Sequence, residues 1–310
     1  MPEARAGALA ERASRAIERQ DWLAPTEEAL QRGIAAAFRA GGAVGQRIKD
    51  VLHGTWLGHP LHPVLTDVPI GAWSTAVVID LLDRAPRARW GVRRGLQQRA
   101  DDAIAVGIAG AAGAALAGMT DWQHTSGPAR RTGLVHAALN TLALTLYVSS
   151  LAQRRRGRRA AGRRLAYAGY GILLASAYLG GRLVYHHRVG VDRADRDARP
   201  LAFARAVRDV DLAEGQPRRV EVDGIRVLLV RRGGQVYALG EVCGHMAGPL
   251  ADGELVDDSI VCPWHGSRFA LEDGRVLNGP ATMPQPCFET RLRDGWIEIR
   301  AAPDVRDAAA

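Results

Sequence analysis

The sequence predicts two domains in order, an α-helical bundle of four membrane spans followed by an all-β domain. The middle of the chain holds four apolar segments separated by polar connections. After Val189 the sequence pattern changes to alternating apolar and polar residues with Gly turns. We expect a polar, partly helical N-terminal segment at 1–50, a membrane domain at 51–190, a linker at 191–202 and the β domain at 203–302.

The apolar segments are each close to the roughly 20 residues that cross a bilayer as a helix. They lie at about 63–82, 103–119, 133–152 and 165–185. Ala and Gly are frequent in them, as in "AIAVGIAGAAGAALAGM", and small residues let membrane helices approach closely. A soluble helical bundle is the alternative, but so few internal charges in four evenly spaced segments favour a membrane domain in contact with the lipid bilayer.

The formal net charge of +8 comes from arginines that cluster between the apolar segments. The first and third connections, "DRAPRARWGVRRGLQQR" and "QRRRGRRAAGRR", carry six and seven arginines, whereas the middle one, "DWQHTSGPARR", has two. Basic loops stay on the cytoplasmic side, so the arginines indicate topology rather than nucleic-acid binding. We therefore expect a multi-pass protein of the bacterial cytoplasmic (inner) membrane, with its β domain on the extracytoplasmic side.

Two Cys–His pairs stand within the β domain. Cys243-x-His245 is followed, after sixteen residues, by Cys262-x-x-His265. Two thiolates and two imidazoles suit a [2Fe–2S] cluster in which cysteines hold one iron and histidines the other. Zinc is the alternative ion, since it takes the same ligand types.

These spacings, the run "CPWHGSRF" and the following "LNGPATMPQP" resemble the Rieske [2Fe–2S] family. The resemblance implies that the four residues bind the cluster and that the loop at Gly279-Pro280-Ala281 shields it. It also implies an electron carrier with a redox donor and acceptor, neither of which the sequence identifies.

Several positions depart from the pattern of that family. Ala247 stands where a Gly is usual, and Gly248 and Trp264 stand where some members have a disulfide. Ser267 is a candidate donor to a cluster sulfur, but Phe269 replaces a tyrosine that often supplies a second hydrogen bond. Fewer donors favour a lower potential, so the domain resembles the ferredoxin-type members that serve oxygenases.

The chain does not resemble a complete oxygenase. Only 45 residues follow His265, too few for a mononuclear iron domain. The third cysteine, Cys287, is expected to be a packed structural thiol. An electron-transfer protein or oxidoreductase subunit is therefore favoured over a complete enzyme.

The membrane half resembles a bacterial family of four-helix membrane proteins for which no function is established. The matching stretches are "LHGTWLGHPLHPVLTDVPIGAW", "GMTDWQHTSGPARRTGLVHAALN" and "GGRLVYHHRVGVD". They cover nearly all of residues 50–192, and the resemblance implies a fold but no chemistry.

The histidines outside the β domain all fall at one end of the predicted helices. Candidates for binding haem b or a quinone there are His59, His62, His136 and His187. Histidine can ligate haem or move a proton with an electron, and we take His62 and His136 as the first pair, with His187 as substitute. Alternatively, these histidines orient the chain or bind headgroups.

Carboxylates near the helix ends also need partners, because a lone charge in a bilayer is costly. Asp67 and Arg182 fall at matching depths, which predicts that they pair. Asp80 and Asp83 lie at the other end, beside Arg84, where we expect ordinary interfacial pairs.

The sequence thus predicts a membrane-bound one-electron carrier, linked to a quinone or haem site in the membrane domain. The alternative is a redox-sensing or docking module in which the helices only anchor a Rieske ferredoxin domain.

Overall fold

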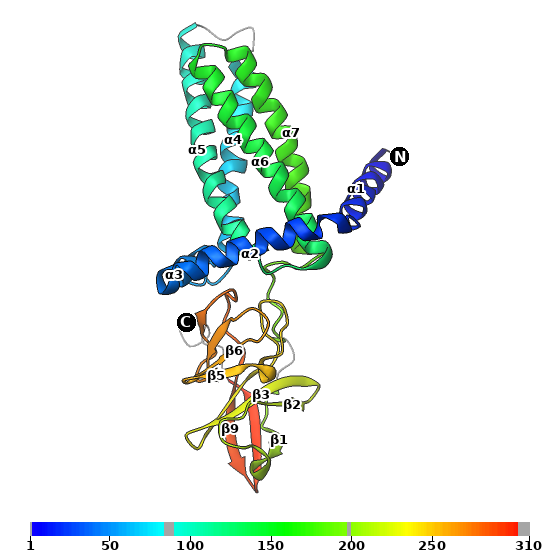
Figure 1. The fold of residues 1–310 in the computed structure, drawn as a ribbon, viewed down its shortest axis with the longest axis vertical. Coiled ribbons are helices and arrows are strands. Elements are labelled where there is room, and N and C mark those ends of the chain that lie inside the picture. Colours follow the sequence, from blue (N-terminus) through cyan, green and yellow to red (C-terminus); the bar gives the residue numbers. More distant parts are fainter. Residues whose placement is uncertain (1, 84–89, 197–199, 303–310) are drawn as a thin grey trace. The chain divides into compact units, whose positions relative to one another are not determined.

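The computed structural model describes residues 2–83, 90–196 and 200–302, with side chains in 10–83, 95–196 and 200–302 (Figure 1). The chain forms two compact units. One consists of residues up to Ile48 together with Leu61–Val189, and the other of Lys49–Pro60 together with residues from Gly190 onward. Residues 49–60, which precede the first apolar helix, thus group with the C-terminal unit.

The first unit consists of helices. The third helix begins in this unit, and its last residues, from Lys49 onward, are assigned to the second unit. They are α1 (Pro2–Glu18), α2 (Ala24–Ala40), α3 (Gly42–His53), α4 (Leu61–Asp83), α5 (Trp90–Trp122), α6 (Gly127–Arg155) and α7 (Arg159–Tyr185). The last four form the elongated bundle in Figure 1, in which α4 packs mainly on α5 and α6 mainly on α7.

Small residues allow close packing in the bundle. A Cβ on Gly107 would lie 2.1 Å from the indole nitrogen of Trp73, and one on Gly110 would lie 2.5 Å from Val68. The buried Trp73 ring stacks on Tyr147, with centroids 3.9 Å apart. The Gly-rich segments therefore place aromatic side chains of one helix directly against the backbone of the next.

Among the residues that the structure describes, three helices are long and apolar enough to cross a membrane: Leu61–Asp83, Gly95–Trp122 and Gly127–Arg155. The fourth bundle helix, α7, is 27 residues long but carries tyrosines, glycines and arginines that make it less apolar. The expected count of four spans is therefore not confirmed and stays a prediction.

Buried ion pairs join the ends of α4, α5, α6 and α7. The Arg154 side chain is 0% exposed and donates to Asp80, with one N–O distance of 2.9 Å, and to Asp101 at 3.4 Å. Arg163 pairs with Asp83 at 2.8 Å. The expectation of ordinary interfacial pairs is wrong for Asp80 and Asp83, because both are buried with arginines that the sequence places in the connection between α6 and α7 or just after it. Arg84 lies outside the described residues.

The N-terminal helices are held against the bundle by charge. Arg182 of α7 pairs with Glu11 at 2.6 Å and Glu18 at 2.8 Å, both from α1. Arg130 of α6 pairs with the buried Glu27 of α2 at 2.8 Å. The predicted Asp67–Arg182 pair is therefore wrong: α1 supplies the carboxylates, and Asp67 is exposed.

Two antiparallel sheets form the second unit. The strands are β1 (Ala204–Arg208), β2 (Arg218–Val222), β3 (Ile225–Arg232), β4 (Gln235–Gly240), β5 (Glu254–Val256), β6 (Ser259–Val261), β7 (Arg268–Ala270), β8 (Val276–Asn278), β9 (Cys287–Arg293) and β10 (Trp296–Ala301). The larger sheet has the order β1-β10-β9-β4-β3-β2, and the smaller has the order β5-β6-β7-β8.

Tight turns fix the register of the hairpins predicted from the sequence. Asp223-Gly224 joins β2 to β3 and Gly233-Gly234 joins β3 to β4, with positive φ at all four residues. Such residues favour the two-residue turns that match strand twist. Leu228 and Leu239 of the larger sheet and Ile260 of the smaller belong to one buried cluster, which also holds two cysteines.

We predict that Arg154→Ala strongly destabilises the helical unit, because it leaves Asp80 as an unpaired buried charge. Breaking such a pair costs about 3–5 kcal/mol. Thermal unfolding of the detergent-solubilised chain, followed by helical circular dichroism, measures the loss. The control is Arg156→Ala, at an exposed position of the next turn, and similar unfolding temperatures for the two variants would contradict the assignment.

Candidate metal centre and membrane histidine site

Two loops of the second unit carry the predicted ligands. Cys243 and His245 lie after β4, and Cys262 and His265 lie between β6 and β7. Each loop turns in the same way: the N–H of Ala247 donates to the Cys243 carbonyl at 2.9 Å, and the N–H of Gly266 donates to the Cys262 carbonyl at 3.1 Å. The two loops therefore fold into the same kind of turn, and each turn carries its Cys–His pair at the same place.

The departure at Ala247 has a conformational cost. Its φ is 63°, in the left-handed region that disfavours residues with a Cβ, whereas the corresponding turn in the second loop has a glycine with φ of 77°. Alanine there costs about 1 kcal/mol relative to glycine.

The structure brings the four predicted ligands together. Cys243 and Cys262 are buried, and the rings of His245 and His265 lie edge to face with centroids 5.0 Å apart. A Cβ on Gly248 would lie 2.8 Å from Cys262 Sγ, so the first loop approaches the second closely only because glycine stands there. The two thiols contact each other, the two imidazoles contact each other, and such paired ligands can hold a [2Fe–2S] cluster with mixed ligation.

The protonation of these groups suits metal binding. The hydrogen bond between the thiols lowers the pKa of Cys262 to about 7 and raises the pKa of Cys243. Burial lowers the pKa of His245 well below its usual value and also lowers the pKa of His265. Both imidazoles are therefore neutral at neutral pH, which is the form that binds a metal.

Buried polar side chains fix the two loops. Gln285, in "MPQP", donates to the carbonyls of Gly240 and Val242 and accepts from the N–H of Gly244, which holds the first loop. Ser267 Oγ accepts from the N–H of Ala281 at 2.9 Å, which ties the second loop to the Gly279-Pro280-Ala281 loop. Sequence reasoning missed Gln285, for which a polar residue between two prolines is the only signal.

A further contact comes from Lys49–Pro60, the distant segment of the same unit. Asp50 accepts from the N–H of Gly279 at 2.9 Å and from Asn278 Nδ2 at 3.2 Å. A Cβ on Gly279 would lie 3.0 Å from Thr55 and 3.3 Å from the buried His53. The segment therefore packs closely on the shielding loop, a contact between residues 229 positions apart that sequence reasoning did not predict.

In the helical unit, two of the four predicted histidines lie together. His62 Nδ1 is 2.8 Å from the carbonyl oxygen of Ala114, and His136 Nδ1 is 2.9 Å from that of Ser176. Carbonyl oxygens only accept, so in the neutral form of each ring Nδ1 bears the hydrogen and Nε2 the lone pair. The ring centroids are 6.3 Å apart and the planes are nearly perpendicular.

The neighbouring helices are shaped around these rings. A Cβ on Gly118 of α5 would lie 2.8 Å from the His62 ring, and one on Gly180 of α7 would lie 3.1 Å from His136. Asn140 Nδ2 lies 3.0 Å from His136 Nε2 and donates to it. Both nitrogens of His136 are thus engaged, whereas within the described residues His62 is hydrogen-bonded through Nδ1, which makes its Nε2 the better candidate ligand.

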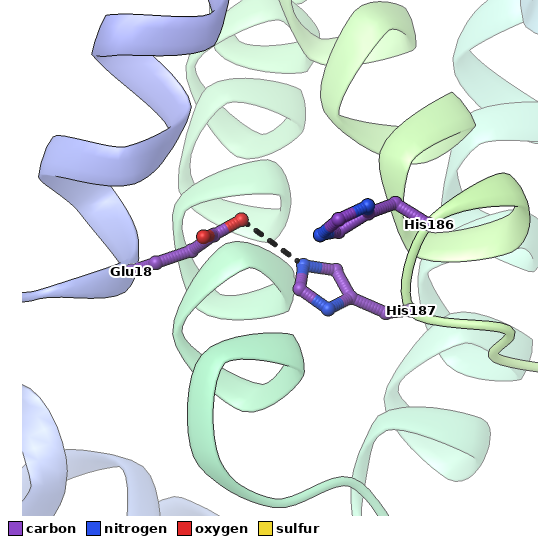
Figure 2. Close-up of side chains that lie close together, drawn as sticks. All are labelled: Glu18, His186 and His187. Atoms are coloured by element: carbon purple, nitrogen blue, oxygen red, sulfur yellow. Dashed lines mark ion pairs between the residues drawn. The ribbon is translucent and has the colours of Figure 1, made fainter.

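The other two candidate histidines lie elsewhere. His59 is exposed and belongs to the second unit, with Nδ1 3.2 Å from the carbonyl oxygen of Pro60. His187 follows α7 and points toward Glu18, with His186 beside it (Figure 2). The structure therefore does not place His187 as the substitute ligand for the His62–His136 pair.

Glu18 Oε1 and His187 Nε2 lie 3.2 Å apart, the contact drawn as a dashed line in Figure 2, and the charge of this pair lies on the carboxylate. Burial alone would raise the pKa of Glu18, but Arg182 and His187 more than offset it and hold that pKa below its usual value. Burial lowers the pKa of His187, although Glu18 opposes the shift. The carboxylate is therefore charged and the imidazole neutral at neutral pH.

Comparison with known proteins matches each half of the chain to a family. Residues 202–289 match the family described as Rieske [2Fe-2S] domain, and residues 58–193 match the family described as Predicted membrane protein (DUF2231). Apoptosis-inducing factor 3 of Mus musculus is 36% identical over 92 residues, which are 30% of this chain and 15% of that protein. The chain thus spans a small part of that relative.

Shorter proteins described as ferredoxins are matched over most of their length. Ferredoxin CarAc of Metapseudomonas resinovorans is 36% identical over 90 residues, which are 29% of this chain and 84% of the ferredoxin. Among solved structures, the ferredoxin of carbazole 1,9a-dioxygenase from Nocardioides aromaticivorans IC177 is 27% identical, with a TM-score of 0.31; the match covers 33% of this chain and 99% of that one.

We predict that Asp50→Ala destabilises the C-terminal unit, because two donors lose their charged acceptor. A hydrogen bond to a charged group contributes about 1.5–3 kcal/mol. Asp50→Asn keeps an oxygen for the N–H of Gly279 and should lose less. The unfolding temperatures of the two variants and the wild type are compared on the full chain, by the visible circular dichroism of the iron–sulfur cluster.

The control for this prediction is Glu254→Ala, at an exposed position of β5, where we expect a change within about 0.5 kcal/mol. If Asp50→Ala unfolds at the same temperature as Glu254→Ala, the segment does not hold the loop.

Proposed function

We propose that this chain, which belongs to the Rieske [2Fe–2S] family through its C-terminal domain and carries a predicted membrane protein domain before it, is a membrane-bound one-electron carrier. The observation that carries the proposal is the convergence of two buried thiols and two neutral imidazoles. We assign Cys243, His245, Cys262 and His265 as the ligands of the cluster. Bound there, a [2Fe–2S] cluster supplies a centre that takes up and releases one electron.

The chain's own residues set the conditions for that centre. Leu250, Ile260 and Phe269 belong to the same buried hydrophobic cluster as the two cysteines, and they exclude water from the cysteine side of the metal centre. Ser267 accepts from Ala281 and keeps its own hydroxyl hydrogen to donate. Phe269 has no hydroxyl, so one potential donor is absent and a potential toward the low end for Rieske centres is expected.

The ligand assignment predicts that Cys262→Ser abolishes the Rieske-type electron paramagnetic resonance signal of the reduced protein, because serine removes a thiolate from one iron. Cys287→Ser is the matched control and should keep the signal, since Cys287 begins β9 and is not in a ligand loop. A signal that survives in Cys262→Ser would refute the assignment.

The membrane domain is proposed to hold a quinone or haem b at His62 and His136. The fixed tautomer of His62 supports either group, since a lone pair at Nε2 can ligate haem iron or accept the proton of a quinol hydroxyl. His136 is held by Asn140 and Ser176 and would orient the group, or ligate it once Asn140 releases Nε2. Were the helices only an anchor, neither group would be bound.

This site predicts that His62→Ala abolishes a haem absorption band or reduction by added quinol, while the cluster spectrum stays intact. Thr75→Ala, at an exposed position of the same helix, is the control and should behave as wild type. Purified protein that carries neither group, with His62→Ala reduced by quinol at the wild-type rate, would favour the sensing or docking module.

The C-terminal domain is proposed to lie outside the cytoplasm of a bacterial cell. Exposed arginines at the connection between α6 and α7 support a cytoplasmic position for that end of the bundle: Arg155, Arg156, Arg158 and Arg164. The paired arginines Arg163-Arg164, which precede the apolar part of α7, suggest export of a folded domain by a twin-arginine route.

This topology predicts that reporter enzymes fused after residue 200 are active only when the reporter works outside the cytoplasm. Fusions within the connection between α6 and α7 serve as the opposite control. Activity of the cytoplasmic reporter alone after residue 200 would reverse the proposed orientation.

A further inference from the structure

Three potential metal ligands from two distant parts of the chain lie together at one edge of the helical unit. Glu18 is the last residue of α1, and His186 and His187 follow α7. Each offers one ligand atom, and these atoms all lie within 4.8 Å of one another. Figure 2 shows the carboxylate and both rings directed toward a common point.

The distances suit a shared ion. Glu18 Oε1 lies 3.2 Å from His187 Nε2, and the two imidazole rings have centroids 4.8 Å apart with nearly perpendicular planes. Ligands bound to one transition-metal ion at about 2.0–2.2 Å are about 3.3–3.6 Å apart in tetrahedral geometry. The His186 side chain is exposed, so packing does not hold its ring at the present separation.

The electrostatic surroundings favour a cation. Both α1 and α7 end here, and the carbonyl end of a helix carries partial negative charge. Arg182 neutralises one of the two carboxylates it binds, Glu11 and Glu18, so one negative charge remains among the three. Arg131 donates to the backbone carbonyl of Glu18 at 2.6 Å and leaves its carboxylate for other partners.

We propose that Glu18, His186 and His187 bind a divalent transition-metal ion of the Zn²⁺ class, which joins the end of α1 to the end of α7. Two imidazoles and one carboxylate suit borderline ions such as Zn²⁺, Co²⁺ and Ni²⁺, whereas Ca²⁺ and Mg²⁺ prefer oxygen ligands. The ion replaces the contact between Glu18 and His187, and water completes its coordination. This site is separate from the four ligands of the iron–sulfur centre and does not depend on the proposed electron transfer.

The test titrates Zn²⁺ into the detergent-solubilised full chain with its iron–sulfur cluster intact, against a chelator of known affinity. We expect one Zn²⁺ per chain with no loss of cluster absorbance, and an affinity at least about tenfold lower in His186→Ala and in His187→Ala. His124→Ala, which changes a histidine between α5 and α6, is the matched control and should bind as wild type. Co²⁺ in place of Zn²⁺ should give a visible ligand-field band that His186→Ala weakens.

His186→Ala keeps the test decisive, because that side chain is exposed and its removal leaves the bonds of Arg182 in place. Equal Zn²⁺ affinity in wild type and His186→Ala would overturn the proposal. So would absence of Zn²⁺ binding in wild type, or Zn²⁺ uptake only as the cluster absorbance falls.

Discussion

Two loops must present a pair of thiols and a pair of imidazoles side by side within the C-terminal unit, and most of that unit can be understood from this requirement. The cysteines are buried in the hydrophobic cluster that residues of both sheets form, whereas the histidines are only partly buried. Gly248 lets the loops approach, Gln285 holds the first loop, and Ser267 ties the second to the shielding loop. None of these residues needs to touch the metal to decide whether four ligands remain in place.

The same requirement explains why a segment from before the membrane helices belongs to this unit. The shielding loop contacts Ser267 on one side and Asp50 and Thr55 on another, so it is held by residues from opposite ends of the chain. The Rieske match begins at residue 202, and residues 49–60 therefore lie outside it. Burial lowers the pKa of His245, and electrostatic effects of His53 and Lys49 add to that shift. The segment therefore influences a ligand as well as a loop.

Local patterns were enough to predict the apolar helices, the hairpins and the two loops that carry the candidate ligands. Gly-Gly and Asp-Gly turns, Cys-x-His spacing and apolar length depend on residues close in sequence. The errors arose where distant elements meet. Arg182 was assigned to Asp67 by depth, but α1 brings Glu11 and Glu18 to it, and nothing local indicates how that helix docks. Arg154 was predicted to be a charge in a connecting loop, but in the bundle it pairs with Asp80 and Asp101. The role of Asp50 could not be predicted from nearby residues, because its partners lie 228 and 229 residues away.

The measurement that tests the central claim most directly is a Mössbauer spectrum of the iron-57-labelled full chain, in the oxidised and one-electron-reduced states. Ligation by two cysteines and two histidines predicts two inequivalent irons, with the added electron on the iron held by the imidazoles. Two equivalent irons in thiolate surroundings, or a purified protein that contains zinc instead of iron, would contradict the account.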